Sequence, residues 1–228
     1  MDRRQFIQAG SAASVLGVAA GCASTGGGSG AGGNVVVVGG GYGGATAAKY
    51  IRMWSEGRVN VTLVEPNDSF ISCPISNLVI GGSKQMADIT TPYDNLAKRH
   101  GVKIIKDRAV SIDAGKRTVT LAGGTVLPYD RLVLSPGIEF MWDALPGLKK
   151  PGAQDKVLHS WNAGPQTVAL RRQLEAMPDG GVYALTIPLS PYRCPPGPYE
   201  RACQVAHYFS KAKPKSKVLI LDANDDVT

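Results

Sequence analysis

The chain has 228 residues, a formal net charge of +7, and 43% hydrophobic and 19% charged residues. This length suffices for one large domain or two small ones with a sizeable core, and the composition is that of a globular protein. The positive charges form no stripe interleaved with aromatic residues, which argues against nucleic acid as a partner. A small anion or an acidic protein partner suits the moderate positive charge.

Residues 1–22 have the pattern of an export signal. The stretch "RRQF" at Arg3–Phe6 resembles a twin-arginine signal, and the apolar stretch Ile7–Ala20 that follows is too short to span a bilayer comfortably. We therefore expect a periplasmic protein exported by the twin-arginine route. Cys22 ends "VAAGC" and leaves two alternatives open, a lipid anchor at this cysteine or plain cleavage. Residues 23–33 form a flexible Gly/Ser-rich linker.

The segment that starts at Asn34 predicts a dinucleotide-binding βαβ unit. Val35–Val38 is a run of β-branched residues, as expected of a strand buried on both faces. A G-x-G-x-x-G motif and a helix that ends near Trp54 follow, and a second strand ends in an acid about twenty residues later. The candidate cofactor-binding residues of this unit are Gly39, Gly41, Gly44 and Glu65.

Each of these residue types has a physical reason. Gly39 allows a tight turn, Gly41 lets the backbone approach a pyrophosphate, and Gly44 lets helix and strand pack closely. The helix N-terminus attracts the phosphates, and Glu65 can accept hydrogen bonds from ribose hydroxyls. The acid argues against NADP, but it leaves FAD and NAD open.

Residues 101–137 point to FAD. They predict a strand, two hairpins with turns at "DAGKRT" and "AGGT", and a buried strand, which is an antiparallel excursion inserted in a parallel sheet. Tyr129–Gly137 returns to the nucleotide-binding layer and ends in a loop of small residues, which makes Pro136 and Gly137 further candidate FAD-binding residues. This succession resembles the FAD domain of flavoprotein disulfide reductases. We expect an α/β protein whose residues 34–145 form the N-terminal part of a Rossmann-like FAD-binding domain.

Residues 146–228 predict a connecting segment and the start of a second Rossmann-like domain. Its expected elements are a helix, a strand, a helix and a strand over Gln166–Met177, Val182–Pro188, Tyr199–Ser210 and Lys217–Asn224. Asp222 stands where Glu65 stood in the first unit. The loop "SPYRCPPGPYERA" contains prolines, which lack the N–H groups that cradle a pyrophosphate. We predict that this unit has lost its NAD site and that the loop instead presents Cys194.

Five stretches together resemble a known family. They are "VVVVGGGYGGATAAKYI", "FISCPISNLVIGG", "YDRLVLSPGIE", "AGPQTVALRRQLEAMPDGG" and "YRCPPGPYERACQVAHYF". The chain is similar to the flavoprotein subunits of flavocytochrome c sulfide dehydrogenases over nearly everything after the signal and linker. The second and last stretches are far more specific than the glycine motif.

The resemblance implies roles for two cysteines. In the family, the cysteine of the second stretch is bonded to the 8α-methyl group of the flavin, and Cys73 occupies that position here. The cysteine of the last stretch is half of a redox-active disulfide beside the flavin, and Cys194 matches it as the catalytic residue. Pro74 departs from the bulky residue expected after the flavin cysteine, which bears on the covalent bond and not on FAD binding.

The resemblance also implies an activity. Hydrosulfide attacks a disulfide that contains Cys194, a persulfide forms and a thiolate is released. The electrons then pass through the flavin to the haem of a separate cytochrome c subunit. Two other functions stay open, a sulfide:quinone oxidoreductase-like enzyme and a tethered, inactive FAD-binding module.

Cys203 and the histidines are expected to be structural. The family is longer than this chain, so we expect an N-terminal fragment or a truncated gene product, with the partner of Cys194 outside it. Cys203 lies too far along the same helix to make a good disulfide with Cys194, and we expect it to be a small buried residue. The three histidines (His100, His159 and His207) lack the spacing of metal ligands, so no metal site is expected.

Overall fold

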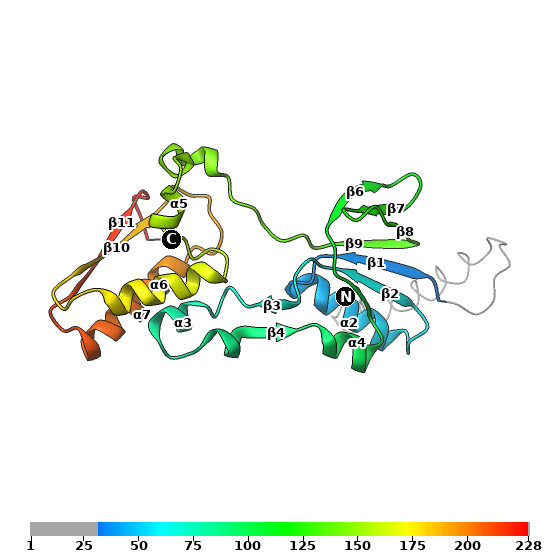
Figure 1. Ribbon diagram of the computed structural model, residues 1–228, viewed down its shortest axis with the longest axis horizontal. Coiled ribbons are helices and arrows are strands. Elements are labelled where there is room, and N and C mark those ends of the chain that lie inside the picture. The colour runs from blue at the N-terminus through cyan, green and yellow to red at the C-terminus, as the bar shows by residue number, and fades with distance from the viewer. Residues whose placement is uncertain (1–31, 228) are drawn as a thin grey trace, which may run out of the picture. The chain divides into compact units, whose positions relative to one another are not determined.

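The computed structural model of the protein describes residues 32–227 (Figure 1). Its strands are β1 (Asn34–Val38), β2 (Asn60–Val64), β3 (Ser69–Ile71), β4 (Thr90–Pro92), β5 (Lys103–Ile105), β6 (Ala109–Asp113), β7 (Thr118–Leu121), β8 (Val126–Pro128), β9 (Arg131–Leu134), β10 (Val182–Ile187) and β11 (Lys217–Asp222). Its α-helices are α2 (Tyr42–Trp54), α3 (Asn77–Gly81), α4 (Asp94–His100), α5 (Ala153–Lys156), α6 (Pro165–Ala176) and α7 (Gly197–Ala212). Short 3₁₀ helices are η1 (Met86–Ile89), η2 (Trp142–Ala144) and η3 (Pro146–Lys149).

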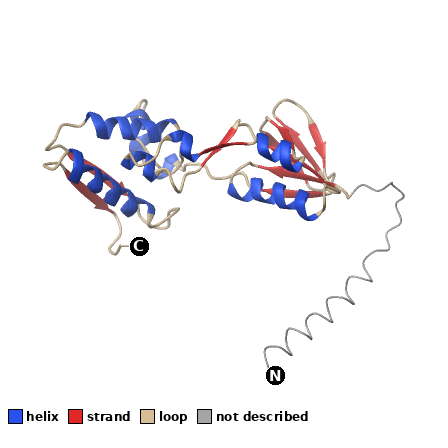
Figure 2. Ribbon diagram, turned by 90° about the horizontal axis from the view of Figure 1, so that it is seen from below, coloured by secondary structure: helices blue, strands red, loops and turns tan. Residues whose placement is uncertain are grey.

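Strand β1 lies inside a parallel sheet of order β5-β2-β1-β9 (Figure 1). Val35 and Val37 pack on one face with residues of α2 and α4, whereas Val36 and Val38 pack on the other face with Val119 of β7. Figure 2 shows α2 and α4 on one side of these strands. Both faces of β1 are therefore covered, which is why its sequence is a continuous apolar run rather than an alternating one.

The predicted antiparallel excursion is present. Strands β6, β7 and β8 form a separate antiparallel sheet between β5 and β9 in the chain, and β9 then pairs with β1 in parallel. Val119 and Leu121 of β7 are almost fully buried against the parallel sheet. The excursion therefore serves as the cover for one face of the nucleotide-binding layer.

The second βαβ unit consists of β10, α7 and β11. Its two strands pair in parallel over their whole length, from Val182 opposite Lys217 to Ile187 opposite Asp222. Helix α7 begins two residues earlier than the sequence predicted, because a proline is tolerated in the first turn of a helix, where its missing N–H has no partner to lose. The predicted elements of this unit are otherwise reproduced with small differences at their ends.

Helix α3 belongs to the core of the second unit although it follows β3 in the chain. Its Ile80 is fully buried in a cluster that α6 and α7 complete with Leu170, Leu174, Val205 and Phe209. Gly81 packs against Gln204 of α7 so closely that an added Cβ atom would lie 2.9 Å from the amide oxygen of that residue. The segment that carries Cys73 is therefore anchored in part by helices more than eighty residues away.

The predicted fold class is confirmed, with a Rossmann-type parallel sheet, an antiparallel excursion and a second parallel βαβ unit. The division near residue 145 stays a prediction. The predicted signal, Cys22 and most of the linker lie outside the described residues. Within residues 32–227, no helix has both the length and the apolar character needed to cross a membrane.

Candidate functional site

Two of the three motif glycines are required by the protein's own packing. Gly39 has φ +93°, and an added Cβ atom would lie 2.0 Å from the carbonyl oxygen of Ser135. At Gly44 the added atom would lie 1.8 Å from the carbonyl oxygen of Gly39. Both contacts are with backbone that cannot move away, so these glycines hold the loop, β9 and α2 together.

Gly41 is different, because the protein leaves its side-chain position open. Its φ of −68° is accessible to any residue, and the nearest atom to an added Cβ is a ring carbon of Phe70 at 3.9 Å. Gly41 is also the N-cap residue of α2 and has no side-chain cap. The open space therefore lies at the positive end of a helix, where an anionic group is favoured.

Glu65 is buried against the glycine loop. It is 8% exposed, and its Oε2 accepts a 2.7 Å hydrogen bond from the Gly40 N–H. Its Oε1 accepts the backbone N–H and the side-chain amide of Asn67, at 3.0 and 2.7 Å. The sequence-predicted acid therefore lies directly beside the motif with which it was paired.

Gly40 and Tyr93 were missed by the sequence reasoning. The Tyr93 hydroxyl donates to the Gly40 carbonyl at 3.0 Å, and a Cβ atom at position 40 would lie 2.5 Å from that hydroxyl. Burial, and then the charge of Glu65, raise the pKa of Tyr93 well above its usual value, so the hydroxyl keeps its proton. The available signal was the additional glycine at a motif position that any residue can occupy.

Pro136 and Gly137 follow β9 at the same sheet edge. The Ser135 N–H donates to the Val38 carbonyl at 2.8 Å, and a Cβ atom at Gly39 would lie 3.2 Å from the Cα of Pro136. Gly137 has φ +86°, with no atom within 4 Å of an added Cβ. The structure thus brings Pro136 to the glycine loop and leaves open space beside Gly137, at the carboxyl ends of the strands where ligands of such sheets bind.

Cys73 is connected to the glycine loop through Tyr42, a second residue that sequence reasoning missed. The Tyr42 hydroxyl is hydrogen-bonded to the Ser72 hydroxyl, and its ring meets Phe70 edge-on with centroids 4.7 Å apart. Tyr42 is the first residue of α2, directly after Gly41. The strand that leads to Cys73 is therefore held against the start of the candidate phosphate-binding helix.

The Trp161 carbonyl joins the two cysteine segments. It lies 3.2 Å from the Sγ of half-buried Cys73 and accepts a 3.3 Å hydrogen bond from the Arg193 guanidinium. Arg193 precedes Cys194 directly, and the Tyr192 ring meets the Trp161 ring edge-on at 5.5 Å. The structure thus connects Cys73 and the Cys194 loop through one short segment of chain.

Cys194 is exposed and adopts the left-handed backbone conformation, with φ +57°. This conformation costs a non-glycine residue about 1 kcal/mol, and such outliers concentrate at functional sites. Its carbonyl accepts the Gly197 N–H at 2.9 Å, and its Sγ would lie 3.3 Å from a Cβ atom added at Gly197. The loop therefore holds the sulfur against the first turn of α7.

Asn77 fixes α7 to the Cys73 segment. It is 5% exposed, and its amide group donates to the Gly197 carbonyl at 3.3 Å and to a carboxylate oxygen of Glu200 at 2.9 Å. Its carbonyl oxygen accepts the Arg201 Nε–H at 3.0 Å. These partners are more than a hundred residues away in the chain, and no local pattern reveals such a contact.

The expectation that Cys203 is buried is wrong. Cys203 is exposed, because Ala202, Val205 and Phe209 form the core-facing stripe of α7 and position 203 lies off that stripe. The structure thus leaves a second accessible thiol, on the helix that follows the Cys194 loop.

The histidines occupy unrelated positions. His100 ends α4 before a left-handed Gly101. His159 is half-buried against Phe140, and burial, followed by the charge of Arg201, lowers its pKa. In the part of the chain that the structure describes, no group of three or more His, Cys, Asp or Glu residues is arranged to hold a metal ion.

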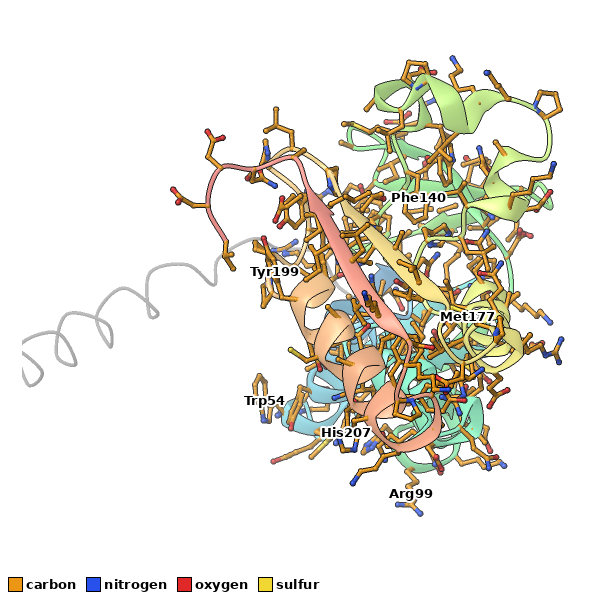
Figure 3. The ribbon with its side chains drawn as sticks, turned by 90° about the vertical axis from the view of Figure 1, so that its left-hand side faces the viewer. Trp54, Arg99, Phe140, Met177, Tyr199 and His207 are labelled. Carbon is orange, nitrogen blue, oxygen red and sulfur yellow. The ribbon has the colours of Figure 1, made fainter. Side chains whose placement is uncertain are left out.

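In the first βαβ unit, Glu65 and Asn67 form an acidic corner. The second unit repeats this acidic corner with Asp222 and Asn224, but its acid has a different additional partner. The Oδ1 of Asp222 accepts the backbone and side-chain N–H groups of Asn224 at 3.0 and 2.8 Å, as Glu65 does with Asn67. The other carboxylate oxygen is hydrogen-bonded to the hydroxyl of Tyr199, labelled at the start of α7 in Figure 3. The hydrogen bonds from Tyr199 and then Asn224 lower the pKa of Asp222.

Two family models match the chain. The model of the pyridine nucleotide-disulphide oxidoreductases matches residues 33–176. The model of the central part of the flavoprotein chain of sulfide dehydrogenase [flavocytochrome c] matches residues 167–228. Together they cover nearly all of the residues that the structure describes.

Curated relatives and solved structures agree with these models. The chain is 25% identical over 178 residues to a mitochondrial sulfide:quinone oxidoreductase of Dictyostelium discoideum, covering 77% of this chain and 38% of that protein. It is 58% identical over 38 residues to a flavocytochrome c sulfide dehydrogenase flavoprotein chain of Chlorobaculum thiosulfatiphilum, covering 17% of this chain and 77% of that sequence. The sulfide:quinone oxidoreductase structure from Aquifex aeolicus has a TM-score of 0.67 and 26% identity, covering 83% of this chain and 43% of that one.

The chain is thus much shorter than several of these relatives, and it spans 38% and 20% of two curated sulfide:quinone reductases. The matched residues nevertheless include the glycine loop, the acidic corner, the Cys73 segment and the Cys194 loop. The chain belongs to the pyridine nucleotide-disulphide oxidoreductases and, among them, to the family of the flavoprotein chain of flavocytochrome c sulfide dehydrogenase.

Proposed function

We propose that this chain provides the FAD-binding and thiol-bearing part of a periplasmic flavoprotein that oxidises hydrosulfide and passes the electrons to a cytochrome c. The observation that carries the proposal is the placement of Cys73 and the Cys194 loop against the same Trp161 carbonyl. Tyr42 in turn connects the Cys73 strand to the glycine loop. A dinucleotide site and two sulfurs are thereby linked through a few direct contacts.

The residues present fit FAD. Gly41 leaves an open position at the N-terminus of α2 for a pyrophosphate, and Glu65 lies beside the loop as an acceptor for ribose hydroxyls. Cys73, at the end of the strand that Tyr42 holds, is the proposed attachment point of the flavin. When bound, a flavin accepts electrons in a pair and releases them singly, which suits a haem acceptor.

The proposed reaction at Cys194 is thiol–disulfide exchange with hydrosulfide. In a disulfide between Cys194 and a second cysteine, HS⁻ attacks one sulfur and the S–S bond breaks. One cysteine keeps the incoming sulfur as a persulfide, and the other leaves as a thiolate that carries the electron pair. The exposed sulfur of Cys194 at the first turn of α7 makes it accessible to a small anion.

Reduction of a quinone is the second candidate function. Similarity to sulfide:quinone oxidoreductases extends over 77% of this chain and supports it. The test is anaerobic sulfide oxidation by the FAD-loaded protein, in a form as long as these relatives, with cytochrome c or a soluble quinone as acceptor. We expect cytochrome c to be reduced faster; reduction of the quinone alone would select the second candidate, and bound flavin that sulfide never bleaches would select the inactive FAD-binding module.

Export through the twin-arginine route is part of the same proposal. Its support is the arginine pair at Arg3 and Arg4, followed by the apolar stretch that ends before Cys22. A lipid anchor at Cys22 is a further alternative within it. Fractionation of the producing cells, with Arg3→Lys and Arg4→Lys together as the export-deficient control, distinguishes periplasmic from cytoplasmic protein, and detergent dependence of the periplasmic form reports a lipid anchor.

We predict that the flavin is bonded to Cys73. Acid precipitation of the wild-type protein should leave the yellow colour in the pellet, whereas Cys73→Ser should release its flavin to the supernatant while it still binds FAD before precipitation. Cys203→Ser is the matched control and should behave as the wild type. Release of all flavin by the wild-type protein contradicts the covalent bond and leaves FAD binding intact.

We predict that neither NADH nor NADPH reduces the flavin. Pro195, Pro196 and Pro198 provide no N–H groups to a pyrophosphate. The measurement is the absorbance of the oxidised flavin under anaerobic conditions after the nucleotide is added, with dithionite as the positive control. Rapid bleaching by NADH contradicts the loss of the second nucleotide site.

A further inference from the structure

Arg201 is a buried cation without a carboxylate partner. It is 5% exposed, and none of the ion pairs formed by residues 32–227 includes it. Its guanidinium donates to the Asn77 side-chain oxygen at 3.0 Å and to the Ser160 carbonyl at 3.4 Å. Burial of a positive charge with only neutral acceptors is costly, so packing alone does not explain an arginine at this position.

Hydrogen bonds link Arg201 to neighbours of both sulfurs of the candidate site. The Ser160 carbonyl that Arg201 contacts is 4.0 Å from the Sγ of Cys73. The Sγ of Cys194 rests against Gly197, one helical turn before Arg201, and Asn77 bridges the Gly197 carbonyl and the Arg201 guanidinium. The arginine is therefore fixed between the two cysteine segments by hydrogen bonds on both sides.

The charges around Arg201 are consistent with this placement. Burial lowers the pKa of the Arg201 guanidinium, and electrostatic coupling to Tyr183, Cys73, Glu200 and Cys194 opposes that effect. Its positive charge in turn helps to lower the pKa of His159. An arginine keeps its proton under these conditions, so a permanent positive charge is coupled electrostatically to both thiols.

We propose that Arg201 is a positioning residue whose fixed charge attracts small anionic sulfur compounds, such as hydrosulfide and thiolates, to the sulfur of Cys194. The inference rests on the proposed function and names the charge of its substrate class. An anion that approaches exposed Cys194 gains Coulomb energy from a charge that solvent screens poorly, because the guanidinium is buried. Asn77 and Ser160 hold that charge in place while the sulfur reacts.

Two other charged groups near Cys194 have to be separated from Arg201. Arg193 is the neighbour of Cys194 in sequence and is exposed, so its charge is in contact with water. Glu200 lies in the first turn of α7 and acts against an approaching anion. The contribution of Arg201 is therefore compared with that of Arg193, through Arg193→Gln. Glu200 needs no such variant, because its negative charge lowers the expected effect and cannot produce it.

The experiment compares two alkylating reagents that differ in charge. Iodoacetate is an anion and iodoacetamide is neutral, and both react with the thiolate, so the ratio of their rates reports the local electrostatic potential rather than the fraction ionised. The purified chain is reduced with a phosphine, alkylated in its folded state, and digested, and Cys194 and Cys203 are quantified separately by mass spectrometry. Exposed Cys203, which lies on α7, is the internal reference.

We expect the iodoacetate-to-iodoacetamide ratio at Cys194 to exceed that at Cys203 by about threefold or more in the folded wild type, and the two to become equal in concentrated urea. Arg201→Gln should remove the excess, Arg201→Lys should retain most of it, and Arg193→Gln should retain most of it as well. Circular dichroism verifies that each variant is folded.

An unchanged ratio in folded Arg201→Gln, or an excess lost in Arg193→Gln instead, overturns the inference. If Arg201→Gln does not fold, the wild-type comparison decides alone, since equal ratios at Cys194 and Cys203 in the folded protein also overturn it. Sulfide-driven bleaching of the flavin is measured separately. Its absence counts against the proposed function, whereas bleaching without the charge effect counts only against the role of Arg201.

Discussion

Changing Gly44 to alanine is expected to destabilise the protein by more than about 4 kcal/mol or to prevent folding. The new Cβ atom would lie 1.8 Å from the Gly39 carbonyl oxygen, and Gly39 is itself held against the Ser135 carbonyl. Neither backbone segment can move without separating α2 from the sheet. Urea denaturation followed by circular dichroism measures the loss, and the variant should contain no FAD.

Gly41→Asn is the matched control for this prediction. Asparagine is a good N-cap residue, the backbone conformation at 41 suits it, and its Cβ meets only a distant Phe70 carbon. We expect the free energy of unfolding without ligand to change by less than about 1 kcal/mol. FAD affinity should fall at least about tenfold, because the side chain fills the space proposed for the pyrophosphate. Retained affinity in this variant would contradict the assignment of that space.

Cys194→Ser is expected to abolish sulfide-dependent turnover in a form of the protein that spans the length of its curated relatives. Serine has nearly the size of cysteine and can adopt the left-handed backbone conformation of residue 194 at a similar cost. The fold and the FAD content should therefore be retained. An oxygen at this position cannot form the disulfide or the persulfide, and the expected loss of turnover is about 100-fold or more. The measurement is the rate of cytochrome c reduction by sulfide.

The control is Cys203→Ser, which removes the exposed thiol of α7 and should leave the rate nearly unchanged. In the 228-residue chain itself, which spans 38% of one curated relative, we expect negligible turnover with or without Cys194. Near-normal turnover by the longer Cys194→Ser protein contradicts the disulfide mechanism. Robust turnover by the 228-residue chain that depends on Cys194 contradicts the need for a second sulfur from elsewhere.

The local parts of the fold were predictable because their signals lie within short windows of sequence. The run Val35–Val38 predicted a strand covered on both faces, and the structure provides a helix layer and the β6–β8 sheet as the two covers. Parallel pairing of β10 with β11 followed from the pattern of strand, helix and strand.

The contacts that assemble the candidate site were not predictable in this way. Asn77 and Arg201 are separated by 124 residues, and each taken alone has the pattern of an ordinary polar residue on a helix. The burial of Cys203 was misjudged because small size favours the interior only when the residue falls on the core-facing stripe of its helix. A hydrophobic pattern indicates which face of an element is buried, but not which distant element covers it.

The attachment of α3 has a mechanical consequence for a bound cofactor. Ser72 is tied to the start of α2, whereas Ile80, a few residues later, is fixed in the core that α6 and α7 form. With its pyrophosphate at the glycine loop and its ring bonded to Cys73, a flavin would be anchored near both ends, and the second anchor would be continuous with α7. The cofactor would then connect the two βαβ units. A motion that separates these units would strain the bound flavin, and removal of the flavin would make the units more mobile relative to one another.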